Sequence, residues 1–295
     1  MRLKDKVAII TGGASGIGLA AAHRFGQEGA ILVLADINQG NIDRASAELG
    51  AKGYRVGGQI CNVTDQAQTH EMARAVVEKL GRIDILVNNA GISRYRPFAE
   101  ATGEDWDAVL DVDLKGVFFC AQAVAPAMRA QKYGRIVNIS SALGTGAAPH
   151  GTAGSPGGSA AYAAAKAGVI MLTKTLAREL GPDGVTVNCV APGTFLTPIS
   201  ASSRTPEQVQ EHLEYRRKTV VLNRIGTLEE LANTILFFAS DESSYVTGHT
   251  LHVDGGRADR SRLGRRLRGD ARVRVEQGLD RRDRRHHPRP RGVAR

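Results

Sequence analysis

Short apolar runs alternate with longer helical segments along most of this chain, and no other feature restricts its fold as strongly. Seven runs have the length and apolar content of buried strands: residues 6–13, 30–36, 54–63, 83–91, 134–141, 184–193 and 250–256. Helical spacing or capping signals mark six other segments: residues 16–29, 41–50, 65–80, 104–131, 160–180 and 228–239. Strands that alternate with such helices pair in parallel and are covered on both faces. The pattern predicts an α/β fold, a doubly wound parallel sheet in a single domain over residues 1–256.

The net charge of +9 is distributed unevenly along the chain. Residues 257–295 hold fifteen arginines, no lysine and five acidic residues, which gives this segment a net charge of +10. Residues 1–256 hold 24 basic and 25 acidic residues, so this part offers no electrostatic case for a nucleic-acid partner. The Arg-rich tail also lacks apolar periodicity and interleaved aromatic residues. This favours translation past a frameshift in GC-rich DNA over a disordered extension or a nucleic-acid-binding arm.

Apolar stretches and cysteines exclude further classes of protein. No apolar stretch reaches the roughly 18 residues of a membrane span, and the apolar run near the N-terminus is too short for a signal peptide. Cys61, Cys120 and Cys189 are widely spaced and form no CxxC pair, so neither a zinc site nor a disulfide framework is expected. We expect a cytoplasmic protein that binds no metal and does not enter a membrane.

A glycine-rich turn follows the first expected strand and leads into the first expected helix. Gly12, Gly16 and Gly18 let the backbone approach a pyrophosphate, whose charge is met by free N–H groups and the positive end of the helix dipole. The second expected strand ends at Asp36, where a carboxylate can bind the ribose hydroxyls of adenosine. That carboxylate repels a 2′-phosphate, and Ile37 supplies no compensating cation. The pattern predicts a Rossmann-like fold that binds NAD(H) in preference to NADP(H).

Several motifs occur in the order and spacing of one enzyme family. They are TGGASGIG at 11–18, CNVTD at 61–65, NNAG at 88–91, NISS at 138–141, YAAAK at 162–166, NCVAPG at 188–193 and VTGHTLHVDGG at 246–256. From about residue 4 to residue 256 the chain resembles the short-chain dehydrogenases/reductases, in the branch with TGxxxGxG and YxxxK motifs.

The resemblance implies a cofactor site and a role for several of its residues. The implied site consists of Gly12, Ser15, Gly16, Ile17, Gly18, Asp36, Ile37, Asn62, Val63, Asn89, Ala90, Gly91, Tyr162, Lys166, Pro192, Gly193 and Thr197. In the family pattern Asn62 and Val63 flank the adenine. Residues 89–91 line the cofactor, and Thr197 meets the nicotinamide side.

Tyr162 and Lys166 lie four residues apart on an expected helix, which places them one turn apart on the same face. A phenol with an ordinary pKa of about 10 is a poor base at neutral pH, but a nearby ammonium group and an oxidised nicotinamide ring favour the phenolate. Tyr162 can then take the proton of an alcohol as hydride leaves, or return it in the reverse direction. Ser141 ends the preceding strand and can hydrogen-bond the substrate oxygen. The family pattern favours it over Ser140, whose side chain would point to the other side of the strand.

Two features depart from the family pattern. Members commonly carry an Asn in the long helix that completes a proton relay through the Lys and a water, whereas this chain has Asp113 at that position. We expect Asp113 to keep the relay role, with its charge acting on Lys166. Ser141 and Tyr162 also stand 21 residues apart, farther than is usual in the family. The extra residues, at 149–158, predict an enlarged flap over the substrate mouth, and His150 within it is expected to be inert.

The segment 194–226 corresponds to the variable substrate lid of the family. Its cations favour a solvated helix face over contact with an acidic or acyl-carrier substrate; they are Arg204, Arg216, Arg217 and Lys218.

The residues favour an enzyme that interconverts a small-molecule secondary alcohol and a ketone with NAD(H), and two alternatives stay open. One is a 3-oxoacyl carrier-protein reductase, which the pattern also resembles although such reductases generally prefer NADPH. The other is a dinucleotide-binding regulator without turnover, which the intact set of Ser141, Tyr162 and Lys166 disfavours. The long helices at 104–131 and 160–180 resemble those through which the family forms homo-oligomers, so a dimer or tetramer is expected.

Overall fold

Seven parallel strands form one sheet in the part of the chain that the structure describes. The structure is a computed structural model, and it describes residues 1–94, 96–146, 159–197 and 205–257. The strands are β1 (Val7–Thr11), β2 (Ile31–Asp36), β3 (Arg55–Ile60), β4 (Ile85–Asn88), β5 (Gly134–Ile139), β6 (Val185–Pro192) and β7 (Thr250–Val253). Their order is β3-β2-β1-β4-β5-β6-β7, and every neighbouring pair is parallel. The predicted α/β fold with a doubly wound, Rossmann-like sheet is confirmed.

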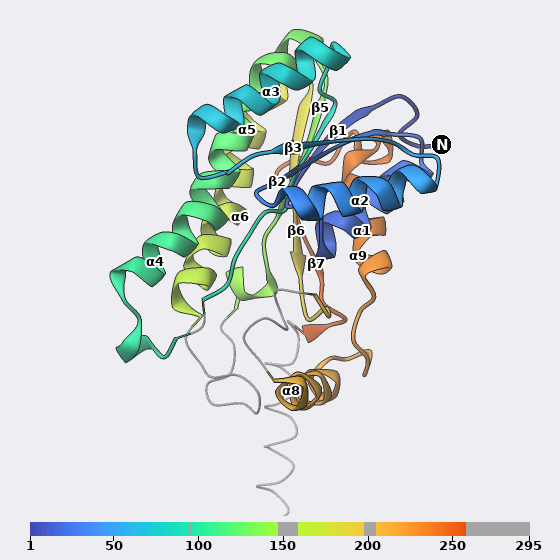
Figure 1. Ribbon diagram of the computed structural model, residues 1–295. Coiled ribbons are helices and arrows are strands. Elements are labelled where there is room, and N and C mark those ends of the chain that lie inside the picture. The colour runs from blue at the N-terminus through green and yellow to red at the C-terminus, as the bar shows by residue number, and fades with distance from the viewer. Residues whose placement is uncertain (95, 147–158, 198–204, 258–295) are drawn as a thin grey trace, which may run out of the picture. The chain divides into compact units, whose positions relative to one another are not determined.

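Helices cover both faces of this sheet (Figure 1). One face carries α1 (Gly16–Gln27), α2 (Gln39–Ala51) and α9 (Leu228–Ala239), and the other carries α3 (Gln66–Leu80), α5 (Gly116–Gln131) and α6 (Ala160–Leu180). Two further helices are α4 (Gly103–Leu110) and α8 (Pro206–Thr219), and α8 lies beyond the carboxyl ends of the strands (Figure 1). Short 3₁₀ turns cover Phe98–Glu100, Ala142–Gly144, Gly181–Asp183 and Asp241–Ser243. Of the helices in the described ranges, none combines the length and apolar character that a membrane crossing requires.

The alternation of side chains along β1 divides the core into two apolar layers. Ala8 and Ile10 belong to the cluster on the α1 and α9 side, together with Phe25, whereas Val7 and Ile9 belong to the cluster on the α3 and α5 side. Successive side chains of a strand point to opposite faces, so a strand that is buried on both faces needs an apolar residue at every position. This explains why the apolar runs of the sequence are continuous rather than alternating.

The single long helix expected over residues 104–131 is interrupted. After α4 ends at Leu110, a five-residue π turn spans Asp111–Lys115, and α5 begins at Gly116. Gly116 passes so close to the β3–α3 connection that a Cβ there would lie 2.7 Å from Cγ2 of Val63. Local π geometry is frequent at functional sites because it displaces side chains and backbone groups from the regular helical positions. Here the turn carries Asp113.

The described residues form a compact unit over Met1–Arg257. Three sequence expectations lie outside the described residues: the nature of the tail, the flap at 149–158 with His150, and the environment of Arg204. They stay predictions.

Candidate active site

The glycine turn after β1 has a backbone conformation and a close packing that side chains would prevent. Gly12 and Gly16 have positive φ angles of 59° and 53°. A Cβ at Gly18 would lie 2.3 Å from the carbonyl oxygen of Gly12, so the helix can approach the turn only without a side chain there. Ser15 is the N-cap of α1, but its side chain accepts no hydrogen bond from the first turn. The first-turn N–H groups of α1 are therefore suited to bind an anion such as a pyrophosphate.

Thr11 and Asn89 hold the shape of this turn. The Thr11 hydroxyl accepts the backbone N–H groups of Asn89 at 3.0 Å and of Ala90 at 3.1 Å. The Asn89 amide donates to the carbonyl oxygens of Thr11 and Gly12, at 3.0 and 3.1 Å. Because the Asn89 side chain is used within the protein, residues 89–91 line the turn mainly with backbone. Thr11 is the first residue of the TGxxxGxG motif, but the sequence did not predict that its hydroxyl holds the turn.

Asp36 reaches from the end of β2 to the glycine turn. One carboxylate oxygen accepts the backbone N–H of Asn38 at 3.1 Å, and the other accepts that of Ala14 at 3.4 Å. Ile37 beside it is 69% exposed. The carboxylate and the uncapped helix end thus lie at the same edge of the sheet, and together they fit the ribose and the pyrophosphate of a dinucleotide.

The remaining expected cofactor residues have mixed positions. Val63 is 8% exposed and packs against Gly116, so it offers a ligand mainly its backbone. The Asn62 side-chain oxygen accepts hydrogen bonds from the backbone N–H and the hydroxyl of Thr64. Pro192 ends β6. The N–H of the next residue, Gly193, donates to the Val253 carbonyl. Both Ile17 and Thr197 are half-buried.

Two adjacent serines at the end of β5 have different contacts. The Ser140 hydroxyl is buried and donates to the carbonyl oxygen of Lys166 at 2.7 Å, which ties the strand to α6. Ser141 caps the following 3₁₀ turn, where its hydroxyl oxygen accepts the N–H of Leu143 at 3.1 Å. A hydroxyl that accepts one hydrogen bond can still donate its own proton. Ser141 is therefore able to donate to a substrate oxygen.

Lys166 lies at the centre of the candidate site. Its Nζ atom lies 3.0 Å from Oδ2 of Asp113, 3.1 Å from the Ile139 carbonyl oxygen to which it donates, and 5.5 Å from the centroid of the Tyr162 ring. Burial is the largest single effect on Lys166 and lowers the pKa of its ammonium, but the Asp113 carboxylate, Tyr162 and Cys189 together raise this pKa above its ordinary value. Lys166 is therefore charged at neutral pH.

Asp113 is held from both sides of its carboxylate. Oδ1 accepts the backbone N–H of Ile92 at 2.8 Å, and a Cβ at Gly91 would lie 3.0 Å from Oδ2. Oδ2 makes an ionic contact with Lys166 rather than a well-directed hydrogen bond, since it meets no donor of the described residues in favourable geometry. The structure thus brings Tyr162, Lys166 and Asp113 together. The Ser140 contact with Lys166 connects the strand end that carries Ser141 to the same helix.

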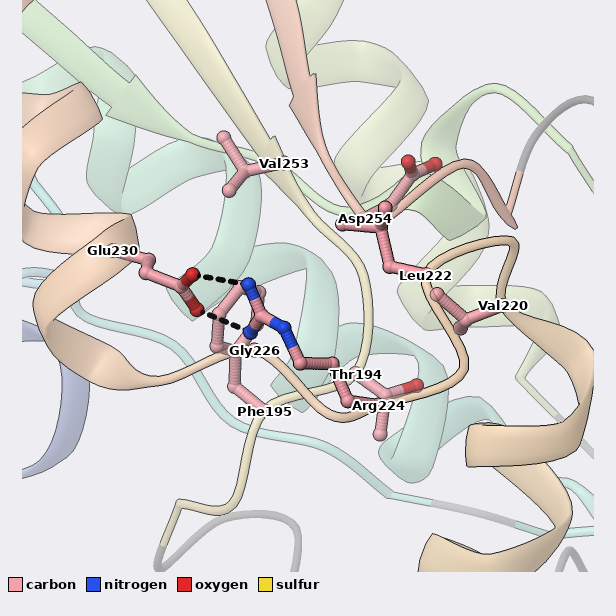
Figure 2. Close-up of a pocket in the computed structure, with 10 residues that line it drawn as sticks. Thr194, Phe195, Val220, Leu222, Arg224, Gly226, Glu230, Val253 and Asp254 are labelled. Carbon is pink, nitrogen blue, oxygen red and sulfur yellow. Dashed lines mark hydrogen bonds and ion pairs between the residues drawn. The ribbon is translucent and has the colours of Figure 1, made fainter.

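A cavity of about 120 Å³ lies among the loop after β6, the end of β7 and the start of α9 (Figure 2). Phe195 and Val220 form part of its apolar wall, and Arg224 makes two hydrogen bonds to the Glu230 carboxylate, of 2.8 and 2.5 Å, on one side. Its lining does not include Ser141 or Tyr162. The cavity is therefore not centred on the candidate catalytic residues.

The cations of α8 do not all face solvent. Arg217 and Lys218 are exposed, as expected for a solvated helix face. Arg216 is only 7% exposed, and its guanidinium carbon lies 5.8 Å from the centroid of the Tyr215 ring. The expectation of a solvated side chain was therefore wrong for Arg216, because a guanidinium can be buried when its plane packs on other groups.

Comparisons with known proteins agree with this geometry. A family model described as "Enoyl-(Acyl carrier protein) reductase" matches residues 12–258. The 3-oxoacyl-[acyl-carrier-protein] reductase FabG of Thermotoga maritima is 47% identical over 256 residues, which cover 87% of this chain and 99% of the relative. The (2S)-[(R)-hydroxy(phenyl)methyl]succinyl-CoA dehydrogenase subunit BbsD of Thauera aromatica is 42% identical, covering 88% and 98%. The crystal structure of levodione reductase has a TM-score of 0.80 at 33% identity, covering 88% of this chain and 99% of that one.

Proposed function

Because the chain belongs to the short-chain dehydrogenase/reductase family and is therefore an oxidoreductase with a dinucleotide cofactor, we propose that it interconverts 3-oxoacyl and 3-hydroxyacyl thioesters. The reaction is the general exchange of a ketone and a secondary alcohol. The names of two relatives support the thioester, since one specifies an acyl-carrier-protein substrate and the other a coenzyme A derivative.

The observation that carries this proposal is the contact of Lys166 with Tyr162 beside the strand end that holds Ser141. In the reductive direction the Tyr162 phenol gives its proton to the ketone oxygen, and the Ser141 hydroxyl donates a hydrogen bond to the same oxygen as negative charge develops there. The Lys166 ammonium stabilises the phenolate that remains. A nicotinamide dinucleotide, when bound, supplies or accepts the hydride.

We propose NAD(H) as the preferred cofactor. Asp36 supports this because its carboxylate stands at the ribose position, and neither Ile37 nor Asn38 after it carries a positive charge. A carboxylate at that position accepts hydrogen bonds from ribose hydroxyls and repels a 2′-phosphate. This preference is proposed independently of the thioester substrate.

A substrate panel with one variant tests the function. Wild-type protein is assayed by NADH absorbance with 3-oxoacyl thioesters and with simple ketones that lack the thioester, and we expect the higher kcat/KM for the thioesters. Tyr162→Phe should lose roughly 10²–10⁴-fold in turnover while still binding NADH, measured by fluorescence titration. Tyr245→Phe is the matched control, since Tyr245 is fully exposed and its hydroxyl should not matter.

Two results would contradict the proposal. Turnover by Tyr162→Phe at the wild-type rate would remove the phenol from the mechanism. Wild-type protein that binds NADH but converts no member of the panel would favour a dinucleotide-binding regulator.

We also propose a homo-oligomer. Apolar side chains on the outer helices support it, because Phe118 on α5 is 40% exposed and Met171 on α6 is 61% exposed. Light scattering coupled to size-exclusion chromatography would give the mass of a dimer or tetramer, and a monomer mass would overturn this.

A further inference from the structure

The candidate site contains a carboxylate that is completely buried. Asp113 has 0% exposure and Lys166 has 4%, and their charged groups lie 3.0 Å apart. Two opposite charges at this distance inside a protein interact strongly because little water screens them. A group beside the ammonium therefore experiences a field that the carboxylate partly offsets.

The Lys166–Asp113 ion pair affects the ionisation of Tyr162 because the Lys166 ammonium lies close to the Tyr162 ring. Its Nζ atom is 5.5 Å from the centroid of the Tyr162 ring. An isolated cation at such a distance favours the ionised form of a phenol, whereas a carboxylate nearby disfavours it. With Asp113 in place, the ammonium of Lys166 favours the ionised Tyr162 phenol while the carboxylate of Asp113 disfavours it.

Among the groups that act most strongly on Lys166, the carboxylate is that of Asp113 from the π turn, and the others are Tyr162 from its own helix and Cys189 from β6. Burial raises the pKa of the Cys189 thiol to about 11, so this thiol is neutral at neutral pH. The contacts from β5 and from the segment after β4 are the Ile139 carbonyl and the Ile92 N–H, which are uncharged.

We propose that Asp113 partly offsets the effect of the Lys166 ammonium on Tyr162 and thereby keeps the Tyr162 phenol protonated at neutral pH, in the form that donates a proton to a ketone. The inference rests on the proposed function, to which it adds the protonation state of the resting phenol. It makes Asp113 a positioning residue that acts through Lys166.

Asp113→Asn tests the role of the charge with little change of shape. An Asn has nearly the same volume and one amide oxygen, which can accept the Ile92 N–H or face Lys166 but not both, so the substitution removes the negative charge together with one of these two contacts. We expect the pH profile of kcat/KM for oxidation of a 3-hydroxyacyl thioester to move to lower pH by about one unit. Asp111→Asn is the matched control, because Asp111 lies on the same π turn and pairs with Lys115 at the surface. The pH profile of kcat/KM for Asp111→Asn should match that of the wild type.

A spectroscopic titration tests the same inference without turnover. The absorbance of tyrosinate is followed against pH with NAD⁺ present, and the Tyr162→Phe titration is subtracted to isolate the Tyr162 phenol. We expect Tyr162 to ionise well above neutral pH in the wild type and about one unit lower in Asp113→Asn. This result stands even if no thioester proves to be a substrate, so failure of the proposed function is distinguishable from failure of the inference.

Two outcomes would overturn the inference. One is a Tyr162 phenol that is already ionised at neutral pH in the wild type, which decides the question even if Asp113→Asn does not fold. The other is a folded Asp113→Asn, with a wild-type melting temperature, whose phenol titrates where the wild-type phenol does.

Discussion

At the scale of single residues, Asp36 is the side chain on which the proposed preference for NAD(H) depends. Replacing it by Ala removes a negative charge from the ribose position, and two charges about 4 Å apart near a protein surface interact by roughly 1–4 kcal/mol. We expect wild-type protein to favour NADH, and the ratio of kcat/KM with NADPH to that with NADH to rise by about tenfold or more in Asp36→Ala. Steady-state kinetics with both cofactors measures this ratio.

A nearby carboxylate provides the control for this prediction. Asp43 lies on the following helix α2, is exposed and accepts a hydrogen bond from Gln39 one turn before it. Asp43→Ala removes the same charge without touching the ribose position, so its ratio should match the wild type. An unchanged ratio in Asp36→Ala would mean that the carboxylate does not face the 2′ position.

The sequence predicted the proximity of those side chains whose spacing has a geometric meaning, while their roles in catalysis stay predictions. Tyr162 and Lys166 are one helical turn apart, and the structure places the ammonium near the ring. The charge of Asp113 acts on Lys166 as expected, across a 3.0 Å contact. The clamp of Thr11 on the glycine turn could not be predicted in this way, since it joins residues about 78 positions apart through a loop whose path no periodicity encodes.

At the scale of elements, the start of α9 depends on one ion pair. The Glu230 carboxylate accepts two hydrogen bonds from the Arg224 guanidinium. It also accepts the backbone N–H of Thr227, as part of a capping box at the helix N-terminus. These bonds hold the pKa of Glu230 at about 2, below its ordinary value of 4.5. A carboxyl group with a lowered folded-state pKa stabilises the fold above its unfolded-state pKa and loses this contribution as pH falls.

Arg224→Gln should therefore have a pH-dependent effect. We expect its deficit in the free energy of unfolding, relative to the wild type, to be constant above about pH 4.5 and to shrink as pH falls toward about 2, where Glu230 becomes protonated. Urea denaturation at a series of pH values measures both proteins. Lys218→Gln is a control, since this exposed cation lies 4.0 Å from Glu214 and should have little effect at any pH. A deficit that does not change with pH would remove Glu230 from the explanation.

Elements with strong apolar periodicity were predicted well, and those without it were not. The strands and most helices appear where apolar runs and caps placed them. The π turn at Asp111–Lys115 was missed because apolar spacing continues through it, and spacing does not report a single displaced hydrogen bond. The helix α8 was given no boundaries because it is strongly polar, although Thr205 and Gln208 form a capping box at its start.

At the scale of the whole molecule, the order of the strands was not predictable from the apolar pattern. A buried strand such as β1 is apolar at every position whichever strands lie beside it, so the pattern reports burial but not neighbours. The order β3-β2-β1-β4-β5-β6-β7 places β1 and β4 side by side. Their adjacency brings the glycine turn after β1 against Asn89 after β4, and the cofactor end of the candidate site exists only because of this pairing.

The folded unit over Met1–Arg257 contains both apolar clusters and every described residue of the candidate site. We therefore predict that deleting residues 258–295 leaves kcat/KM and the melting temperature unchanged. The deletion removes fourteen arginines and five acidic residues and leaves a formal net charge of zero, so any salt-dependent binding to nucleic acid should disappear with it. For both proteins, steady-state kinetics measures kcat/KM, calorimetry measures the melting temperature and filter binding measures the affinity for nucleic acid. A lower melting temperature in the shortened protein would show instead that the Arg-rich segment is part of the folded unit, since a segment that packs on the core contributes to its unfolding free energy.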